Sequence, residues 1–159
     1  MSNAISPRPR AVGVVKRHFT IVASQFNAAY VQGLVDHLVA ELRLLTPTVT
    51  TTLFQVPGAF EIPVVVRELA SQKRGDAIIA IGVIMKGETD HAKNLSHSVT
   101  DALQRIAVAH AIPVINVVLS FDNESQARAR CLEDEINRGT EAARAAIEIT
   151  NVMSKLRNK

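Results

Sequence analysis

The sequence predicts an α/β fold: a three-layer α/β/α sandwich with a four-stranded parallel sheet. Four short apolar segments rich in β-branched residues alternate along the chain with longer segments whose apolar residues recur at helical spacing. The segments between the strands are long enough for the right-handed crossovers that join parallel strands. Ligands of such sheets bind beyond the carboxyl ends of the strands, near the point where strand order reverses, so the candidate site residues are expected there.

Length and composition fit one compact domain. The chain has 159 residues, of which 47% are hydrophobic and 21% are charged. Its net charge is +3, but basic and acidic residues are interspersed, aromatic residues make up 4% and Trp is absent. Because nucleic-acid sites combine a basic surface with stacking side chains, we expect no nucleic-acid partner, and small anionic ligands instead.

Three features predict a cytoplasmic location. No segment approaches the ~18 consecutive apolar residues of a membrane span, so no membrane partner is expected. The first residues carry Pro7 and Pro9 where a signal peptide would need its apolar region. The single cysteine, Cys131, excludes an intrachain disulfide, and a domain without disulfides suits a reducing cytosol.

The expected domain organisation is a flexible N-terminal arm over residues 1–12 and a single domain over residues 13–159. Pro7 and Pro9 lack a backbone N–H and push the residue before each of them out of helical space, which favours an extended arm. For the same reason the arm is a poor added strand for a neighbouring sheet.

The first strand is predicted over residues 19–23, where the sequence is apolar and β-branched. A helix follows, with Asn27 as its N-cap and an end near Pro47. Its apolar positions fall at i, i+3, i+4, i+7 and i+11, which is the spacing of one buried face. These positions are Val31, Leu34, Val35, Leu38 and Leu42.

The second strand is predicted over residues 50–56, and Pro57 ends it. A helix over residues 59–72 tolerates Pro63 because the first helical turn has no intrahelical partner for its missing N–H. Residues 76–84 form the most continuous apolar run, so we expect the third strand there, in the middle of the sheet.

The last third of the chain is expected to hold one strand and three helices. The helices are predicted over residues 92–110, 124–134 and 139–156, the strand over 113–119, and a turn over 120–123. The residues expected to face the core are Leu95, Val99, Ala102, Ile106 and Ala109 in the first of these helices, and Ala142, Ala146, Ile149, Met153 and Leu156 in the last.

The stretch 81–91 is the first candidate site, because an apolar strand there runs into a Gly-bounded turn and a helix that begins beside His91. A helix N-terminus offers unpaired amides and a positive dipole end, so it binds anions and favours a neutral imidazole able to accept a proton. The main-chain amides at Glu88 and Thr89 are a candidate phosphate cradle, although no P-loop pattern is present. The alternative is a solvated histidine at a helix whose N-cap is Asp90.

Other candidates each have a structural alternative. Phe26 is either a stacking platform or part of the core, and Glu61 either reads ligand hydroxyls or caps its own helix. Arg128 and Arg130 stand two apart on a helix, so only one can enter a given pocket, and both can be surface residues. Cys131 is interpreted as unreactive. The histidines expected to be structural or exposed are His18, His37, His97 and His110.

Three segments together resemble a known family. The first is Gln25-Phe26-Asn27, the second is VPGAFEIP over residues 56–63, and the third is GVIMKGETDH over residues 82–91. In this order and spacing they resemble the lumazine synthase family of riboflavin biosynthesis, and the second segment is the most specific of the three. The resemblance extends from about residue 13 to 155 and implies a flavodoxin-like sheet.

The resemblance implies an activity that needs no cofactor and no metal. The implied reaction condenses 5-amino-6-(D-ribitylamino)uracil with 3,4-dihydroxy-2-butanone 4-phosphate to give 6,7-dimethyl-8-ribityllumazine, phosphate and water. His91 is the implied proton-transfer residue. The implied substrate-binding residues are Phe26 and Asn27; Ala59, Phe60 and Glu61 for the ribityl chain; Val83, Ile84 and Met85 for the pyrimidine edge; Glu88, Thr89 and Arg130 for the phosphate; and Asn116 and Arg138.

Three departures from the family pattern bear on these roles. Asn116 stands where many members carry an aromatic residue lent by the neighbouring subunit. Lys86 replaces the more usual Arg. The residues around Arg130 lack the common Glu-Arg-Ala-Gly pattern, so its assignment to the phosphate is open, while Arg138 stands where a basic residue often contacts the substrate.

The resemblance also implies partners. Members of the family form pentamers whose sites lie between subunits, and some assemble into decamers or sixty-subunit shells; we expect a homopentamer here because of Pro7 and Pro9. Riboflavin synthase is a candidate protein partner. Two other functions stay open: a non-catalytic lumazine- or flavin-binding oligomer, and a receiver-like signalling domain, which would need acidic residues at positions such as Gln25 and Ile84.

Overall fold

The computed structural model describes residues 1–9 and 15–157. It contains one parallel sheet with strand order β2-β1-β3-β4. The strands are β1 (His18–Ser24), β2 (Thr50–Val56), β3 (Ala77–Met85) and β4 (Val114–Phe121). The chain steps outward from β1 to β2 and then crosses back to β3, so the order reverses beside β1. The predicted α/β sandwich with a flavodoxin-like sheet is confirmed.

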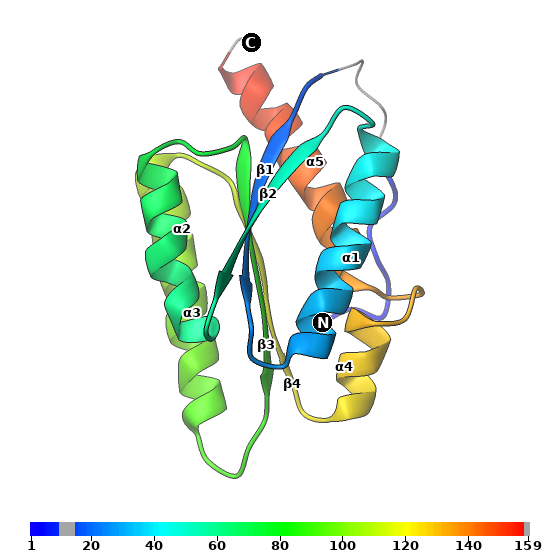
Figure 1. The fold of residues 1–159 in the computed structure, drawn as a ribbon, viewed down its shortest axis with the longest axis vertical. Helices are drawn as coiled ribbons and strands as arrows, with labels where there is room; N and C mark the ends of the chain where they lie inside the picture. Colours follow the sequence, from blue (N-terminus) through cyan, green and yellow to red (C-terminus); the bar gives the residue numbers. More distant parts are fainter. Residues whose placement is uncertain (10–14, 158–159) are drawn as a thin grey trace.

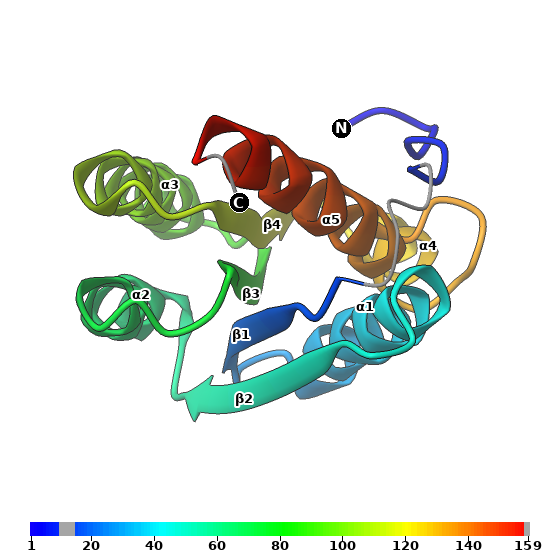
Figure 2. The ribbon, with the colours of Figure 1, turned by 90° about the horizontal axis from the view of Figure 1, so that it is seen from above.

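Helices cover both faces of this sheet (Figures 1 and 2). One face carries α1 (Ala28–Leu45), α4 (Glu124–Cys131) and α5 (Arg138–Leu156), and the other carries the 3-10 turn η1 (Ala59–Glu61), α2 (Ile62–Ser71) and α3 (His91–His110). None of the helices that the structure describes is long and apolar enough to cross a membrane.

The central strand β3 is buried from its first residue to Ile84, as its continuous apolar run predicts. Successive side chains of a strand point to opposite faces, and both faces are packed here. Ile79 and Ile81 join the core beneath α1 and α5, whereas Ile78 and Ala80 join the core beneath α2 and α3. Two apolar cores therefore hold the strand ends in place.

Some predicted boundaries are wrong. The turn predicted over residues 120–123 begins later, because Ser120 and Phe121 still pair with the end of β3. The following helix stops at Cys131 rather than at residue 134. The helix predicted from residue 59 starts as the short η1 turn, and Pro63 then lies in the first turn of α2, as expected.

Two predicted helix faces are partly wrong. On α3, Ala109 is exposed, whereas Leu103, which was not among the residues predicted to face the core, is buried. On α5, Leu156 is exposed, and the buried face includes Ile147 and Thr150. The α5 face differs because this helix packs against α1 as well as the sheet, and a helix with two neighbours buries a wider stripe than a simple heptad count gives.

Glycine permits a close approach between α1 and α5. A Cβ atom built on Gly139 would lie 2.2 Å from the carbonyl oxygen of Leu34 in α1. Asn137 caps α5 at this point, because its side-chain oxygen accepts hydrogen bonds from the amides of Gly139 and Thr140. The start of α5 is therefore fixed against the middle of α1.

The first nine residues lie along α1 and α5. Arg8 forms an ion pair with Glu41 of α1, with 2.9 Å between Nε and Oε1. Arg144 of α5 bonds the same carboxylate and the main-chain oxygen of Ser6. Residues 10–12 of the expected arm lie outside the described residues.

Candidate active site

The carboxyl ends of β1, β2 and β3 surround a cavity of about 370 Å³, here called the strand-end cavity. The start of α3 completes it. Its lining residues are Phe26, Asn27, Gly58, Ala59, Phe60, Glu61, Val83, Ile84, Met85, His91, Ala92 and Leu95. The predicted site residues at the first three strand ends and His91 are therefore brought together, at the edge that the topology rule indicates.

The aromatic rings of this cavity are open to solvent. Phe26 is 73% exposed and Phe60 is 69% exposed in the single chain. The alternative that Phe26 belongs to the core is therefore wrong. Exposed phenylalanine rings at the mouth of an apolar cavity are typical of a surface that a ligand or a second protein chain covers.

Asn27 occupies the N-cap position of α1, but its side chain does not cap the helix. The backbone at Asn27 is left-handed, with φ 57° and ψ 44°. Its side-chain nitrogen donates instead to the carbonyl oxygen of Val83, at 2.7 Å. The predicted capping role is thus wrong, because the end of β3 lies within reach and offers an acceptor. This contact between residues far apart in the sequence carries no local signal.

Glu61 caps its own turn, as the structural alternative predicted. One of its carboxylate oxygens accepts a hydrogen bond from the amide of Gly58, at 2.9 Å. This contact fixes the direction of the side chain, and the carboxylate retains lone pairs for ligand hydroxyl groups. Capping and ligand binding are therefore compatible at this residue.

His91 is the first residue of α3, and its exposed side chain lines the cavity. Its amide donates to the hydroxyl oxygen of Thr89, at 3.4 Å. Asp90 precedes the helix without a side-chain capping bond. The imidazole therefore stands at the positive end of a 20-residue helix, beside the apolar end of β3.

The segment before α3 lies outside the residues that line the cavity. Glu88 and Thr89 are both exposed. Lys86 forms an ion pair with Asp122, with 3.4 Å between Nζ and Oδ1, and both side chains are about two-thirds exposed. A Cβ atom on Gly87 would have no heavy atom within 4 Å. The main chain here is therefore accessible to an anion.

Asn116, Arg130 and Arg138 lie elsewhere. Asn116 and Arg138 line a second cavity of about 380 Å³ between β4 and α5, here called the α5 cavity. The side chain of Asn116 accepts a hydrogen bond from the Val118 amide, at 3.0 Å, and donates to Thr100, at 3.4 Å. A single chain therefore does not bring these three residues to the strand-end cavity.

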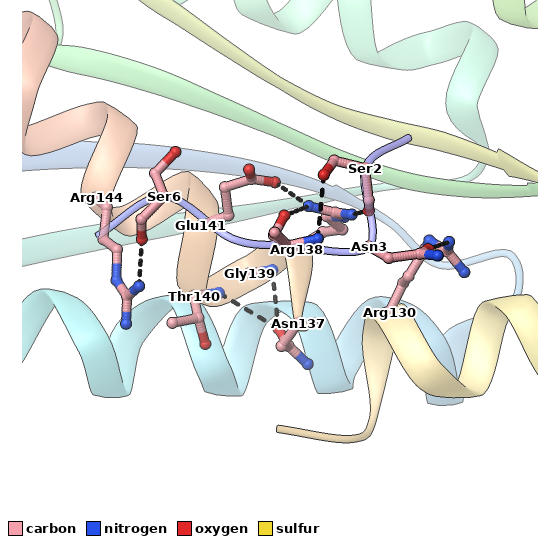
Figure 3. Close-up of polar contacts among 11 residues, drawn as sticks. Ser2, Asn3, Ser6, Arg130, Asn137, Arg138, Gly139, Thr140, Glu141 and Arg144 are labelled. Atoms are coloured by element: carbon pink, nitrogen blue, oxygen red, sulfur yellow. Dashed lines mark hydrogen bonds and ion pairs between the residues drawn. The ribbon is translucent and has the colours of Figure 1, made fainter. Parts of the chain in front are cut away.

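The N-terminal residues accept hydrogen bonds from Arg130 and Arg138 (Figure 3). Arg138 is 5% exposed, pairs with Glu141 at 2.6 Å, and donates to the main-chain oxygens of Ser2 and Ala4. Arg130 donates to the side-chain oxygen of Asn3, at 3.0 Å. Within the described part of the chain, the Nε atoms of both arginines are buried and have no hydrogen-bond partner. Both guanidinium groups thus retain capacity for an acceptor.

Away from the strand-end cavity, Glu41 and Cys131 have shifted pKa values. Hydrogen bonds from Arg8 and Arg144 hold the pKa of Glu41 below its usual range, although burial opposes them. Burial raises the pKa of the Cys131 thiol to about 12, so the thiol stays protonated at neutral pH, in agreement with its interpretation as unreactive. Over residues 1–9 and 15–157, no three His, Cys, Asp or Glu side chains are grouped to hold a metal ion.

Sequence reasoning missed three lining residues: Gly58, Ala92 and Leu95. Leu95 was expected to face the core, and it lies one helical turn after His91 on the same side of α3. The predicted position of His91 at the start of the helix could therefore have indicated that Leu95 lines the same cavity. Gly58 and Ala92 have no side chain or a small one and gave no such signal.

Comparison with known proteins gives consistent matches. A family model described as 6,7-dimethyl-8-ribityllumazine synthase matches residues 16–154. The 6,7-dimethyl-8-ribityllumazine synthase of Leptothrix cholodnii is 38% identical over 137 residues, which is 86% of each chain. The protein of that name from Paraburkholderia phymatum is 41% identical over 133 residues, 83% of this chain and 75% of the relative. That from Methylibium petroleiphilum is 39% identical over 86% of this chain and 83% of the relative.

Proposed function

The chain belongs to the 6,7-dimethyl-8-ribityllumazine synthase family, and from this premise we propose that it catalyses the family reaction. In that reaction 5-amino-6-(D-ribitylamino)uracil and 3,4-dihydroxy-2-butanone 4-phosphate condense to 6,7-dimethyl-8-ribityllumazine, phosphate and water. One observation carries the proposal. Residues of all three family-like segments, which are distant in sequence, line a single cavity of about 370 Å³.

The strand-end cavity suits the pyrimidine substrate. The exposed ring of Phe26 offers a face for stacking, in the cavity that it lines together with the apolar end of β3. Glu61, held by the Gly58 amide, accepts hydrogen bonds from the ribityl hydroxyl groups beside Phe60. The apolar wall suits a flat ring, and the carboxylate selects a polyhydroxylated chain.

The phosphate of the second substrate is proposed to bind at the start of α3. The exposed main chain at Glu88 and Thr89 precedes the positive end of the helix, and this arrangement favours an anion. A single chain holds Arg130 and Arg138 away from this cavity. In an oligomer, these arginines of a second copy would donate charge-assisted hydrogen bonds to the phosphate. We therefore propose an oligomer, and from the family resemblance a pentamer or a multiple of pentamers. We also propose that the enzyme acts in the cytoplasm.

His91 is the proposed proton-transfer group. The substrate amine attacks the ketone carbon, and the resulting alcohol must be protonated before it leaves as water. Loss of phosphate, and ring closure with loss of a second water molecule, also require protons to move near neutral pH, for which an imidazole is suited. The reactants are themselves reactive, so holding them together supplies much of the acceleration.

The test is product formation by the purified chain from both substrates, followed by the absorbance of the lumazine. We expect turnover without any added metal or cofactor. A chain that binds lumazine tightly but forms none from the substrates would instead be the non-catalytic oligomer, which no observation favours. Light scattering of the same sample measures the assembly. A monomer would contradict the proposed oligomer, and particles of megadalton mass would contradict the bare pentamer expected from Pro7 and Pro9.

A further inference from the structure

The end of β3 extends beyond the end of its neighbour β1. The register between β1 and β3 runs only as far as the pair Ala23 and Ile81. On its other side, β3 continues to pair with β4 as far as Met85. The carbonyl group of Val83 therefore lies past the last β1 partner, although Val83 itself is only 3% exposed. A buried carbonyl in this position needs a donor from outside the sheet.

The side chain of Asn27 supplies that donor. Its amide nitrogen lies 2.7 Å from the Val83 oxygen, which is a short and well-formed hydrogen bond. On the β2 side, the amide of Gln25 donates to Val56 at 2.8 Å, and the amide of Phe26 donates to Pro57 at 3.2 Å. The short segment 25–27 therefore ties together the ends of three strands, all of which border the strand-end cavity.

Two simpler explanations for an asparagine here are insufficient. The first is helix capping, but the Asn27 side chain makes no capping bond to α1. The second is the left-handed backbone, which asparagine tolerates better than most residues. The left-handed region alone would favour glycine equally, whereas the bond to Val83 requires the side-chain amide. The two requirements are separable by substitution.

We propose that Asn27 is a positioning residue, whose amide fixes the Val83 carbonyl and thereby holds the β3 wall at a set distance from the ring of Phe26. A flat heterocycle bound between that ring and that wall depends on this distance. The inference rests on the proposed function, because it concerns the pyrimidine half of the site. Asn27 thus acts through Val83 and Phe26, and its second N–H and its oxygen remain available for the direct substrate contact expected from the sequence.

Two variants distinguish the role of the Asn27 side-chain amide from that of its left-handed backbone. Asn27→Gly keeps the left-handed conformation and removes the donor, and Asn27→Asp keeps the size of the side chain but sets an oxygen against the Val83 oxygen. We expect both to raise the KM for the ribitylaminouracil by about tenfold or more, Asp more than Gly. The KM for the phosphorylated ketone should stay within about twofold, because the phosphate site does not involve this bond.

Lys73→Gly is the matched control. Lys73 is also left-handed, with φ 51°, but it lies between α2 and β3, away from the strand-end cavity. We expect this variant to leave both KM values unchanged, which isolates the effect of relaxing a left-handed residue. Light scattering and circular dichroism should show the same assembly and secondary structure for all four proteins.

The inference is overturned if Asn27→Gly keeps the wild-type KM for the ribitylaminouracil, since the backbone conformation would then suffice. It is also overturned if the KM values for both substrates rise together, since that indicates a general loosening of the fold. The proposed function fails separately: in that case the wild-type chain itself forms no lumazine. An active wild type with an unaffected Asn27→Gly variant defeats only the positioning role.

Discussion

At the scale of single residues, the side chains with proposed roles in chemistry are held by few contacts within the chain. The ring of Phe26 is largely exposed, and the side chain of His91 is open to solvent. Glu61 and Asn27 each have one hydrogen bond to a neighbouring main-chain group. Because exposed side chains contribute little to folding, substitutions at Phe26 and His91 should affect catalysis far more than stability.

Replacing His91 by alanine should slow the reaction without abolishing it. We expect kcat to fall about 10- to 100-fold, because proton transfer is lost while the substrates are still held together. Steady-state kinetics of lumazine formation measure this, with His97→Ala as control, since His97 is exposed on the same helix and does not line the cavity. Complete loss of activity in a folded His91→Ala protein would contradict the prediction.

At the scale of elements, the pairing of α1 with α5 depends on two local features. One is the absence of a side chain at Gly139, which lets the helices approach. The other is the carboxylate of Glu41 on α1, which is 4% exposed and is bonded by Arg144 of α5 and by Arg8. A buried carboxylate needs such partners, because removing it from water is costly.

Gly139→Ala should destabilise the fold by about 1–3 kcal/mol, because the new methyl group would overlap the Leu34 carbonyl oxygen and force the helices apart. Chemical unfolding at a fixed protein concentration measures this. The control is Gly87→Ala, since a Cβ there meets open space. Equal stability of the two variants would show that α1 and α5 can separate without cost.

Glu41→Gln should lower the free energy of unfolding at pH 7 by about 1–3 kcal/mol, because the arginines lose a charged acceptor. The pKa of Glu41 is lower in the folded chain than its ordinary value of 4.5, so its stabilising effect is complete above that pH. It is lost as the pH falls through the lower folded value. The free energies of unfolding of the wild type and of Glu41→Gln should therefore converge in acid. A difference between them that stays constant down to about pH 2 would contradict this prediction.

At the scale of the whole molecule, the predicted site is divided between two surfaces. The strand-end cavity holds Phe26, Glu61 and His91, whereas Asn116 and Arg138 line the α5 cavity. A cyclic assembly in which one copy presents the first surface and its neighbour the second would complete the site. The N-terminal residues cover Arg138 in the single chain, so they would have to move for such a contact (Figure 3).

A mixing experiment tests this division. Phe26→Ala and Arg138→Ala each impair one half of the proposed site, so each homogeneous oligomer should be weakly active. When equal amounts are unfolded together and reassembled, about a quarter of the sites should combine two intact halves and recover activity. Each variant refolded alone is the control. If the mixture is no more active than its components, Arg138 does not complete a neighbour's site.

The sequence predicted much of the site because the residues at each strand end lie in short continuous segments. These residues end or follow apolar strands that alternate with helices, and parallel strands bring such ends to one edge. They are Phe26, Ala59 to Glu61, Val83 to Met85, and His91. The fold class followed from the same alternation. The burial of β3 could likewise be predicted from the local sequence, since a continuous apolar run is typical of a strand covered on both faces.

Features that depend on a distant neighbour were decided only by the tertiary structure. The side chain of Asn27 bonds Val83, 56 positions away, in preference to its own helix. The buried face of α5 differs from its pattern because α1 packs beside it, and Arg138 lies at a different surface from His91. Hydrophobic spacing reports which side of an element avoids water. It does not report which partner covers that side, because packing and long-range hydrogen bonds form only when the elements meet.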